Sequence, residues 1–237
     1  MKTPKSKMKQ VKEQNDSKSN KLEVRTKINM LLIIILVALS FIVSFLAYPA
    51  LPDTIAIHWG INGEANGFAP KDMGIMIMPI LTLILVAILI AVPKLDPLKG
   101  NIESFKEIYY EFITIFCGFM TYLHIITLLL NLGVSANIIS LLAPAFALLM
   151  YYMGILLGSA KRNYFIGIRT PWTLDNETVW NKTHKLGEKL FKLSAAISIL
   201  GVIFPNQAII LILAPIIISS IYLMIFSYLE HKKQTKK

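Results

Sequence analysis

The chain has 237 residues, 55% of them hydrophobic, and a mean hydropathy of +0.60, which excludes an ordinary soluble domain. Its net charge of +10 would suit a nucleic-acid-binding protein, but the basic residues cluster in short segments between long uncharged runs. We therefore predict a membrane protein whose positive charge contacts the lipid bilayer, with no direct binding to nucleic acid.

The uncharged runs define the membrane segments. A hydrocarbon core of about 30 Å needs about 20 apolar residues per helix, and helices satisfy their backbone groups internally. The run at 112–160 holds two spans with a turn at 131–137, and the run at 193–229 completes two more if the first begins near Leu186. The sequence thus predicts an all-α membrane protein with six transmembrane helices, at residues 29–48, 73–92, 112–132, 138–160, 186–204 and 208–229.

Lysine and arginine are distributed unevenly over the segments that connect these helices. Of the 24, only Lys71 lies in the loop at 49–72, and the others lie before the first span, in 93–111, in 161–192 and after residue 229. The positive-inside rule places the basic segments in the cytoplasm. We therefore expect a multi-pass plasma-membrane protein with both termini in the cytoplasm.

The chain divides into three parts. Residues 1–27 are rich in Lys, Ser and Gln without periodicity, so we predict a basic, disordered cytoplasmic tail. Residues 28–111 are predicted to form a first helical hairpin with an outer loop at 49–72 and a cytoplasmic linker. Residues 112–237 are predicted to form a four-helix region, which contains the cytoplasmic segment 161–192, called the elbow below.

The outer loop is predicted to fold onto the helices. Pro and Gly residues mark successive turns, and the alternating stretch TIAIHW at 54–59 favours a short strand. His58 lies near Asp53 and Glu64 in the sequence, but one His with two scattered carboxylates lacks the clustered spacing of a zinc site. We therefore predict that His58 is structural or part of a binding surface, and we predict no metal.

Each helix that is predicted to run inward carries a proline about two turns from its outer end, at Pro79, Pro144 and Pro215. Proline removes a backbone hydrogen bond and kinks a helix. Three kinks at one depth would splay the outer halves of the helices and form a shallow cavity. Because membrane helices tolerate proline, coincidence is the other interpretation.

Two further features lie within the predicted spans. His124 falls near the middle of the third span, where an ionisable group is a candidate for function. Because no carboxylate lies in the uncharged run 112–160 with it, a neutral His bonded to a neighbouring hydroxyl is favoured over a proton relay. Gly154 and Gly158 form a pair of small residues suited to close helix contact.

The elbow is predicted to turn sharply and then to begin a helix. Thr170 precedes Pro171, which forces extended backbone at Thr170 and starts a short turn. Asp175 suits the N-cap of the following helix, with Glu177 in the first turn, where the helix dipole favours an acid.

The helix that follows carries a cationic stripe suited to lipid headgroups, formed by Lys182, Lys185, Lys189 and Lys192. Trp172 and Trp180 suit the same interfacial layer. This interfacial interpretation accounts for the lysines and tryptophans. It leaves unexplained the combination of Arg169, Thr170, Pro171, Thr173 and His184.

Sequence motifs of common enzyme classes are absent. The chain has no phosphate-binding glycine loop followed by lysine, no paired-histidine zinc helix and no G-x-S-x-G elbow. We therefore predict a protein that is not an enzyme, with no catalytic residue and no cofactor.

Two segments resemble known families. NYFIGIRTPWTLDNETVWNKTHKLGEKLF, at 163–191, is similar to the C-terminal signature of SdpI-type proteins, and LPDTIAIHWGINGEANGFAPK, at 51–71, resembles DUF1648. The first resemblance assigns to a cytoplasmic signature the residues Gly167, Arg169, Thr170, Pro171, Trp172, Thr173, Trp180 and His184. The second assigns to an outer pattern the residues His58, Gly63, Gly67 and Lys71.

The resemblance implies immunity to a secreted peptide toxin that attacks membranes. It also implies signalling, in which the toxin-engaged protein holds a transcriptional repressor at the membrane. A small-solute transporter or exporter is the alternative, with Thr121, His124 and Asn131 along a thin polar path. Two roles stay open for Arg169: a clamp that bonds helix-end carbonyls, or a dock for a partner carboxylate.

Overall fold

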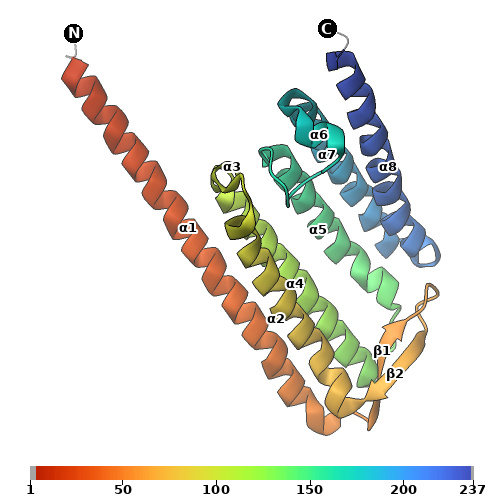
Figure 1. Ribbon diagram of the computed structural model, residues 1–237. Coiled ribbons are helices and arrows are strands. Elements are labelled where there is room, and N and C mark those ends of the chain that lie inside the picture. Colours follow the sequence, from red (N-terminus) through yellow and green to blue (C-terminus); the bar gives the residue numbers. More distant parts are fainter. Residues whose placement is uncertain (1–3, 236–237) are drawn as a thin grey trace.

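The computed structural model describes residues 4–235, with side chains described for Asn20 and from Leu22 onward (Figure 1). The α-helices are α1 Pro4–Ala47, α2 Lys71–Leu95, α3 Lys99–Glu103, α4 Lys106–Asn131, α5 Ile138–Ser159, α6 Pro171–Asp175, α7 Glu177–Ser198 and α8 Ala208–Thr235. Three short 3-10 helices are η1 Tyr48–Ala50, η2 Ile199–Val202 and η3 Pro205–Gln207. The strands β1 Thr54–Trp59 and β2 Ala65–Pro70 form an antiparallel hairpin, which confirms the strand predicted from TIAIHW.

The long helices form two groups that run up and down the molecule (Figure 1). Helices α1, α2 and α4 pack together, α5, α7 and α8 pack together, and α4 contacts α5 to join the two groups. The β-hairpin lies at one end of the molecule, and α3 and α6 lie at the other (Figure 1). The predicted cytoplasmic linker and the elbow therefore share one end, opposite the predicted outer loop.

Five helical stretches in the described part are long and apolar enough to cross a membrane: Leu22–Ala50, Lys71–Leu95, Lys106–Asn131, Ile138–Ser159 and Pro205–Thr235. Helix α7, which covers most of the predicted fifth span, is not among them, because it carries six charged residues from Glu177 to Lys192. It nevertheless packs along both α5 and α8 (Figure 1). The fold is therefore a mostly helical membrane fold with five candidate spans, and the sixth span stays a prediction.

The basic tail differs from its predicted form. Helix α1 extends from the first span back to Pro4, so Leu22–Lys27, predicted as disordered, are helical. Lys, Glu and Arg have good helix propensity, and a helix already nucleated in the apolar span extends at little cost. The side chains of residues 1–19 and of Lys21 lie outside the described part.

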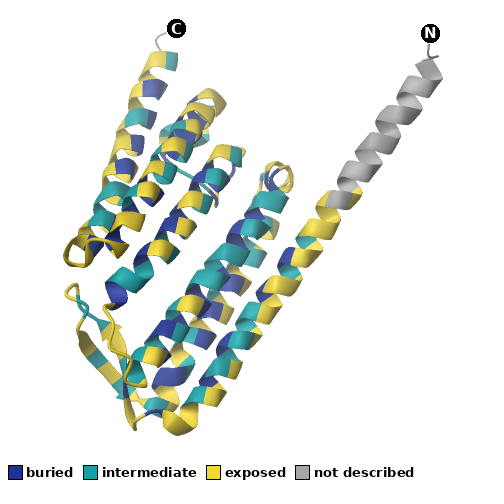
Figure 2. Ribbon diagram, turned by 180° about the vertical axis from the view of Figure 1, so that it is seen from behind, coloured by how far each residue is buried: buried dark blue, intermediate teal, exposed yellow. Residues whose placement is uncertain are grey.

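The outer faces of the helices are apolar. In Figure 2, buried residues lie mainly where helices meet, and exposed residues face outward along α1 and α8. Large apolar side chains are among the most exposed, with Phe45 79% and Ile218 66% accessible. An exposed apolar surface of this extent suits contact with lipid chains.

Hydroxyl groups join α1 to α4 in the interior. His124 Nε2 lies 2.7 Å from Ser44 Oγ, and Ser40 Oγ lies 3.2 Å from Thr121 Oγ1. All four side chains are buried. His124 therefore has the neighbouring hydroxyl partner that the sequence favoured.

Small residues allow α5 and α7 to approach closely. A Cβ atom on Gly158 would lie 2.2 Å from Glu188 Oε2, and one on Gly154 would lie 2.9 Å from the Glu188 carbonyl oxygen. The close helix contact predicted for this glycine pair is thus observed, because the two positions leave room for the Glu188 residue of α7.

The three predicted kink prolines lie inside helices: Pro79 in α2, Pro144 in α5 and Pro215 in α8. None of them lines the cavity described below. Their role in splaying the helices stays a prediction.

Candidate functional site

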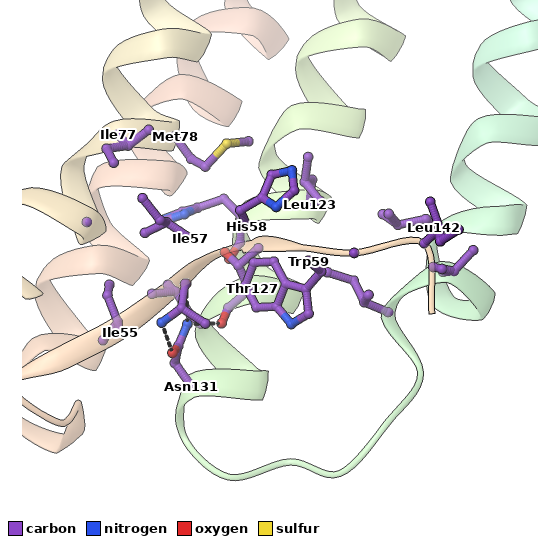
Figure 3. A pocket seen from close by; sticks show the side chains of 18 of the residues that line it. Ile55, Ile57, His58, Trp59, Ile77, Met78, Leu123, Thr127, Asn131 and Leu142 are labelled. Carbon is purple, nitrogen blue, oxygen red and sulfur yellow. Dashed lines mark hydrogen bonds between the residues drawn. The ribbon is translucent and has the colours of Figure 1, made fainter. Parts of the chain in front are cut away.

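A cavity of about 330 Å³ lies between the β-hairpin and the adjoining ends of four helices (Figure 3). Strand β1 forms one side, and α2, α4, α5 and α8 supply the rest, so both helix groups contribute. Most lining side chains are apolar, among them Ile55, Met78, Leu123, Leu142 and Leu213. Polar lining groups come from His58, His124, Thr127 and Asn131. An apolar cavity with a few convergent polar groups has the character of a ligand site.

Asn131, at the end of α4, attaches β1 to the helices. Its Oδ1 accepts a hydrogen bond of 2.7 Å from the Ala56 backbone N–H. Its Nδ2 donates to the carbonyl oxygens of Ala56 at 3.0 Å and Thr127 at 2.8 Å (Figure 3). The Asn131 amide therefore holds the strand that covers the cavity.

The outer residues implied by the resemblance shape the hairpin. Gly63 has φ +80°, and a Cβ atom on Gly67 would lie 2.9 Å from His58 Cβ across the strands. His58 Nδ1 lies 2.5 Å from Asn66 Oδ1. The fourth residue, Lys71, begins α2 directly after β2. All four thus belong to one unit, but only His58 lines the cavity.

At the opposite end, Gly167 and His184 form the centre of the elbow. His184 Nδ1 donates to the Trp180 carbonyl oxygen at 2.9 Å, and its Nε2 accepts the Ile168 N–H at 2.9 Å, which defines a neutral ring. The His184 ring stacks on the Trp180 indole at 3.9 Å between centroids. Gly167 has φ +118°, and a Cβ atom there would lie 2.3 Å from His184 Nε2.

Thr170 and Thr173 form a reciprocal capping box at the start of α6. The Thr173 N–H donates to Thr170 Oγ1 at 3.2 Å, and the Thr170 N–H donates to Thr173 Oγ1 at 2.9 Å. Pro171 occupies the first turn, where its missing N–H costs nothing. The Thr170 hydroxyl also lies 3.0 Å from Ser227 Oγ, which ties the elbow to α8.

The two elbow tryptophans occupy different environments. Trp172 is half-buried, with its ring 5.1 Å from that of Tyr228. Trp180 is 0% exposed, and its indole N–H donates to the Ala160 carbonyl oxygen at 2.8 Å, at the end of α5. The interfacial prediction was therefore wrong for Trp180, because the helix-end carbonyl supplies a buried partner for its N–H.

The cap of α7 also differs from prediction. Asn176, not Asp175, is the N-cap, and its Oδ1 accepts the Val179 N–H at 3.1 Å. Asp175 instead ends α6, because the capping box starts a separate short helix one turn earlier. Glu177 lies in the first turn of α7, as predicted.

The two arginines of the elbow make different contacts. Arg169 is exposed and donates one hydrogen bond, of 2.8 Å, to the Tyr164 carbonyl oxygen. Arg162 is less exposed and donates to the helix-end carbonyl oxygens of Leu174 at 3.0 Å and Asp175 at 3.3 Å. The helix-end clamp is thus made by Arg162, which sequence reasoning missed.

Two buried polar residues that sequence reasoning also missed hold the loop 160–170. Asn163, 0% exposed, accepts the N–H groups of Phe165 and Ile166 through Oδ1 and donates to two carbonyl oxygens through Nδ2. Asp96, 3% exposed, accepts the N–H groups of Leu98 and Tyr164, so it joins the linker to the elbow. Asn and Asp often bond nearby backbone in turns, which was the available signal.

The neutral His184 makes the elbow sensitive to acid. Burial lowers the pKa of His184 from 6.5 to about 4, and the bond to the Trp180 carbonyl opposes this only partly. The unfolded chain takes up the proton near pH 6.5, but the folded chain does so only near pH 4. The free energy of unfolding therefore falls as the pH drops through this window, by about 2 kcal/mol at about pH 5.

Thermal unfolding in detergent at several pH values measures this loss. A His184→Gln variant should lack this component of the pH dependence. If the variant and the parent lose stability equally between about pH 7 and about pH 5, another group is responsible.

These features together define a multi-helix integral membrane protein with an apolar cavity at one end and a polar elbow at the other. Residues 159–227 match the SdpI/YfhL protein family, and residues 35–83 match DUF1648, a domain of unknown function. The C-terminal part of the chain thus resembles the SdpI/YfhL family, and the predicted resemblance is confirmed for both segments.

Most of the chain is also similar to a known protein. It is 29% identical over 201 residues to "Immunity protein SdpI" of Bacillus subtilis (strain 168). The aligned residues cover 84% of this chain and 94% of that protein. No solved structure matches.

Proposed function

We propose that this protein is a non-enzymatic immunity protein of the plasma membrane that protects its cell from a secreted, membrane-active peptide. The observation that carries the proposal is its similarity to an immunity protein along 94% of that protein's length. The similarity includes both the hairpin and the elbow, so the two ends of the molecule are proposed to act in one protein.

The proposed topology has six spans, with residues 186–204, which begin near the middle of α7, as the fifth and both termini in the cytoplasm. The distribution of Lys and Arg supports it, because only Lys71 lies in the hairpin end. The cavity then faces the outer leaflet, the side from which a secreted peptide arrives.

The cavity is the proposed site of contact with the peptide. Its volume of about 330 Å³ is at the lower end of the range for ligand pockets, roughly 300–1,000 Å³. It therefore suits one or two apolar side chains rather than a whole helix. Burial of one large apolar side chain contributes about 1.5–3 kcal/mol, enough to anchor a peptide that already lies in the membrane.

The exposed Arg169 is the proposed contact for a cytoplasmic partner, such as a transcriptional repressor. Its side chain makes one hydrogen bond within the described residues, to the Tyr164 carbonyl, while Arg162 supplies the clamp. An Arg169→Ala protein should therefore fold normally and lose capture of the repressor at the membrane. Loss of folded protein from the membrane would instead favour a clamp role for Arg169.

The transporter alternative is supported less well. The polar groups of Thr121, His124 and Asn131 are hydrogen-bonded to α1 or to β1, so each already has a structural role. Solute flux in proteoliposomes would support the alternative.

Expression in peptide-sensitive bacteria tests the proposed function. Cells that produce the protein should survive concentrations of a secreted membrane-active peptide that kill cells carrying an empty vector. Unchanged killing by every related peptide tested would contradict immunity.

Filling the cavity should abolish protection without unfolding the protein. Leu123 points into the cavity from α4 (Figure 3), so Leu123→Trp would occupy the space proposed for the peptide. We expect the protective effect to fall at least about tenfold, which corresponds to about 1.4 kcal/mol of lost binding. The measurement is the peptide concentration that kills half of the cells.

Leu129→Trp is the matched control. Leu129 is 44% exposed on the same helix and lies outside the cavity, so this variant should protect normally. Equal protection by both variants, at equal amounts in the membrane, would exclude the cavity as the peptide site.

A further inference from the structure

A shallow groove of about 240 Å³ lies between the elbow part of α7 and α8. Lys182, Lys185 and Lys189 line it along one stripe of α7, and Leu186 and Phe226 form its apolar part. Residues three and four apart on a helix share one face, so the three ammonium groups project on the same side. The groove therefore combines concentrated positive charge with an apolar surface.

The positive charge in the groove is only partly neutralised. Lys182 pairs with Glu230 of α8, a carboxylate that is nearly buried. Lys185 and Lys189 are exposed, and neither makes an ion pair with another described residue. Like charges held one turn apart repel each other, so an anion bound between them would relieve the repulsion.

The surface beyond the lysines is apolar. Leu193 on α7 and Ile218 and Tyr222 on α8 are all at least half exposed, at 56%, 66% and 51%. A molecule that fits this surface has an anionic head and a long hydrocarbon part, which together describe an anionic phospholipid.

We propose that the groove is a binding site for one anionic phospholipid, with its phosphate between Lys185 and Lys189 and an acyl chain against Phe226. The site lies at the elbow end of the molecule, opposite the cavity, and does not depend on the proposed immunity function. Basic pockets between membrane helices on the cytoplasmic side bind anionic headgroups by the same combination of charge and apolar contact. The bound lipid would brace the junction of α7 with α8 beside the elbow.

Native mass spectrometry of the full chain tests the site. The protein is extracted from liposomes that contain equal amounts of phosphatidylglycerol and phosphatidylcholine, and the lipid that stays bound is identified. We expect retained phosphatidylglycerol, and we expect its retention to fall at least about tenfold in the double variant Lys185→Gln/Lys189→Gln. Both lysines are exposed, so an unchanged thermal midpoint without added lipid should accompany the loss.

The matched control is Lys232→Gln/Lys233→Gln, which removes the same charge from exposed positions in the last turn of α8. It should retain phosphatidylglycerol at the level of the parent. Equal loss in both variants, or equal retention of the two lipids by the parent, would overturn the site. Displacement of the lipid by inorganic phosphate or by an acidic peptide, with no effect of the acyl chain, would also contradict it.

Discussion

Replacement of Gly167 by alanine should unfold the elbow. The new Cβ atom would lie 2.3 Å from His184 Nε2 and 3.3 Å from the Trp180 ring, at a backbone φ of +118°. Neither ring can move aside, because the two are stacked on each other and buried. Backbone strain of about 1–3 kcal/mol adds to about 1–3 kcal/mol for the lost Ile168–His184 hydrogen bond, so we expect a loss of about 2–6 kcal/mol.

The free energy of unfolding in detergent, followed by tryptophan fluorescence, measures this loss. Gly100→Ala is the control, since a Cβ atom at Gly100 would meet no heavy atom within 4 Å. Because Gly100 lies inside the short helix α3, alanine there should be neutral or slightly stabilising. A Gly167→Ala protein as stable as the Gly100→Ala protein would show that the elbow tolerates another backbone conformation.

Replacement of Trp180 by alanine should be similarly damaging. The side chain is fully buried, stacks on His184 and is bonded to the carbonyl oxygen that ends α5. Truncation of a buried tryptophan to alanine costs about 3–5 kcal/mol through the cavity that it leaves. The Ala160 carbonyl would also lose its partner, so we place the effect at the upper end of that range.

The same substitution at Trp172 provides the comparison. Trp172 is only half-buried and packs against one aromatic ring, that of Tyr228, so Trp172→Ala should cost about 0.5–1.5 kcal/mol. Both variants are measured by thermal unfolding in the same detergent. Equal destabilisation by the two substitutions would mean that the burial of Trp180 does not determine its contribution to stability, which would contradict the prediction.

Patterns that act within one segment were readable from the sequence. The apolar runs identified the long helices because each span must satisfy its own backbone in lipid. The alternation of TIAIHW identified β1, and the Thr170–Pro171 pair identified a sharp turn, because both depend on neighbouring residues alone. The family resemblance singled out Gly167, although the residues that it contacts could not be named.

Contacts between distant segments were not readable. Trp180 and Trp172 are equivalent in an interfacial pattern, and only the position of the α5 end makes one of them buried. Arg162, rather than Arg169, bonds the carbonyl oxygens at the end of α6, because the orientation of α6 decides which guanidinium group reaches them. The Asp96 carboxylate accepts a hydrogen bond from the Tyr164 N–H, although the two residues are 68 positions apart in the sequence.

The sequence by itself therefore determined the membrane class, the long helices, the hairpin and the family resemblance, since these follow from local composition and spacing. Only the tertiary structure decided the cavity, which needs one strand and four helices from both groups, and the interior of the elbow. Buried polar groups must find partners wherever the chain brings them, so hydrogen bonds such as that from Trp180 to Ala160 are set by the packing of whole helices.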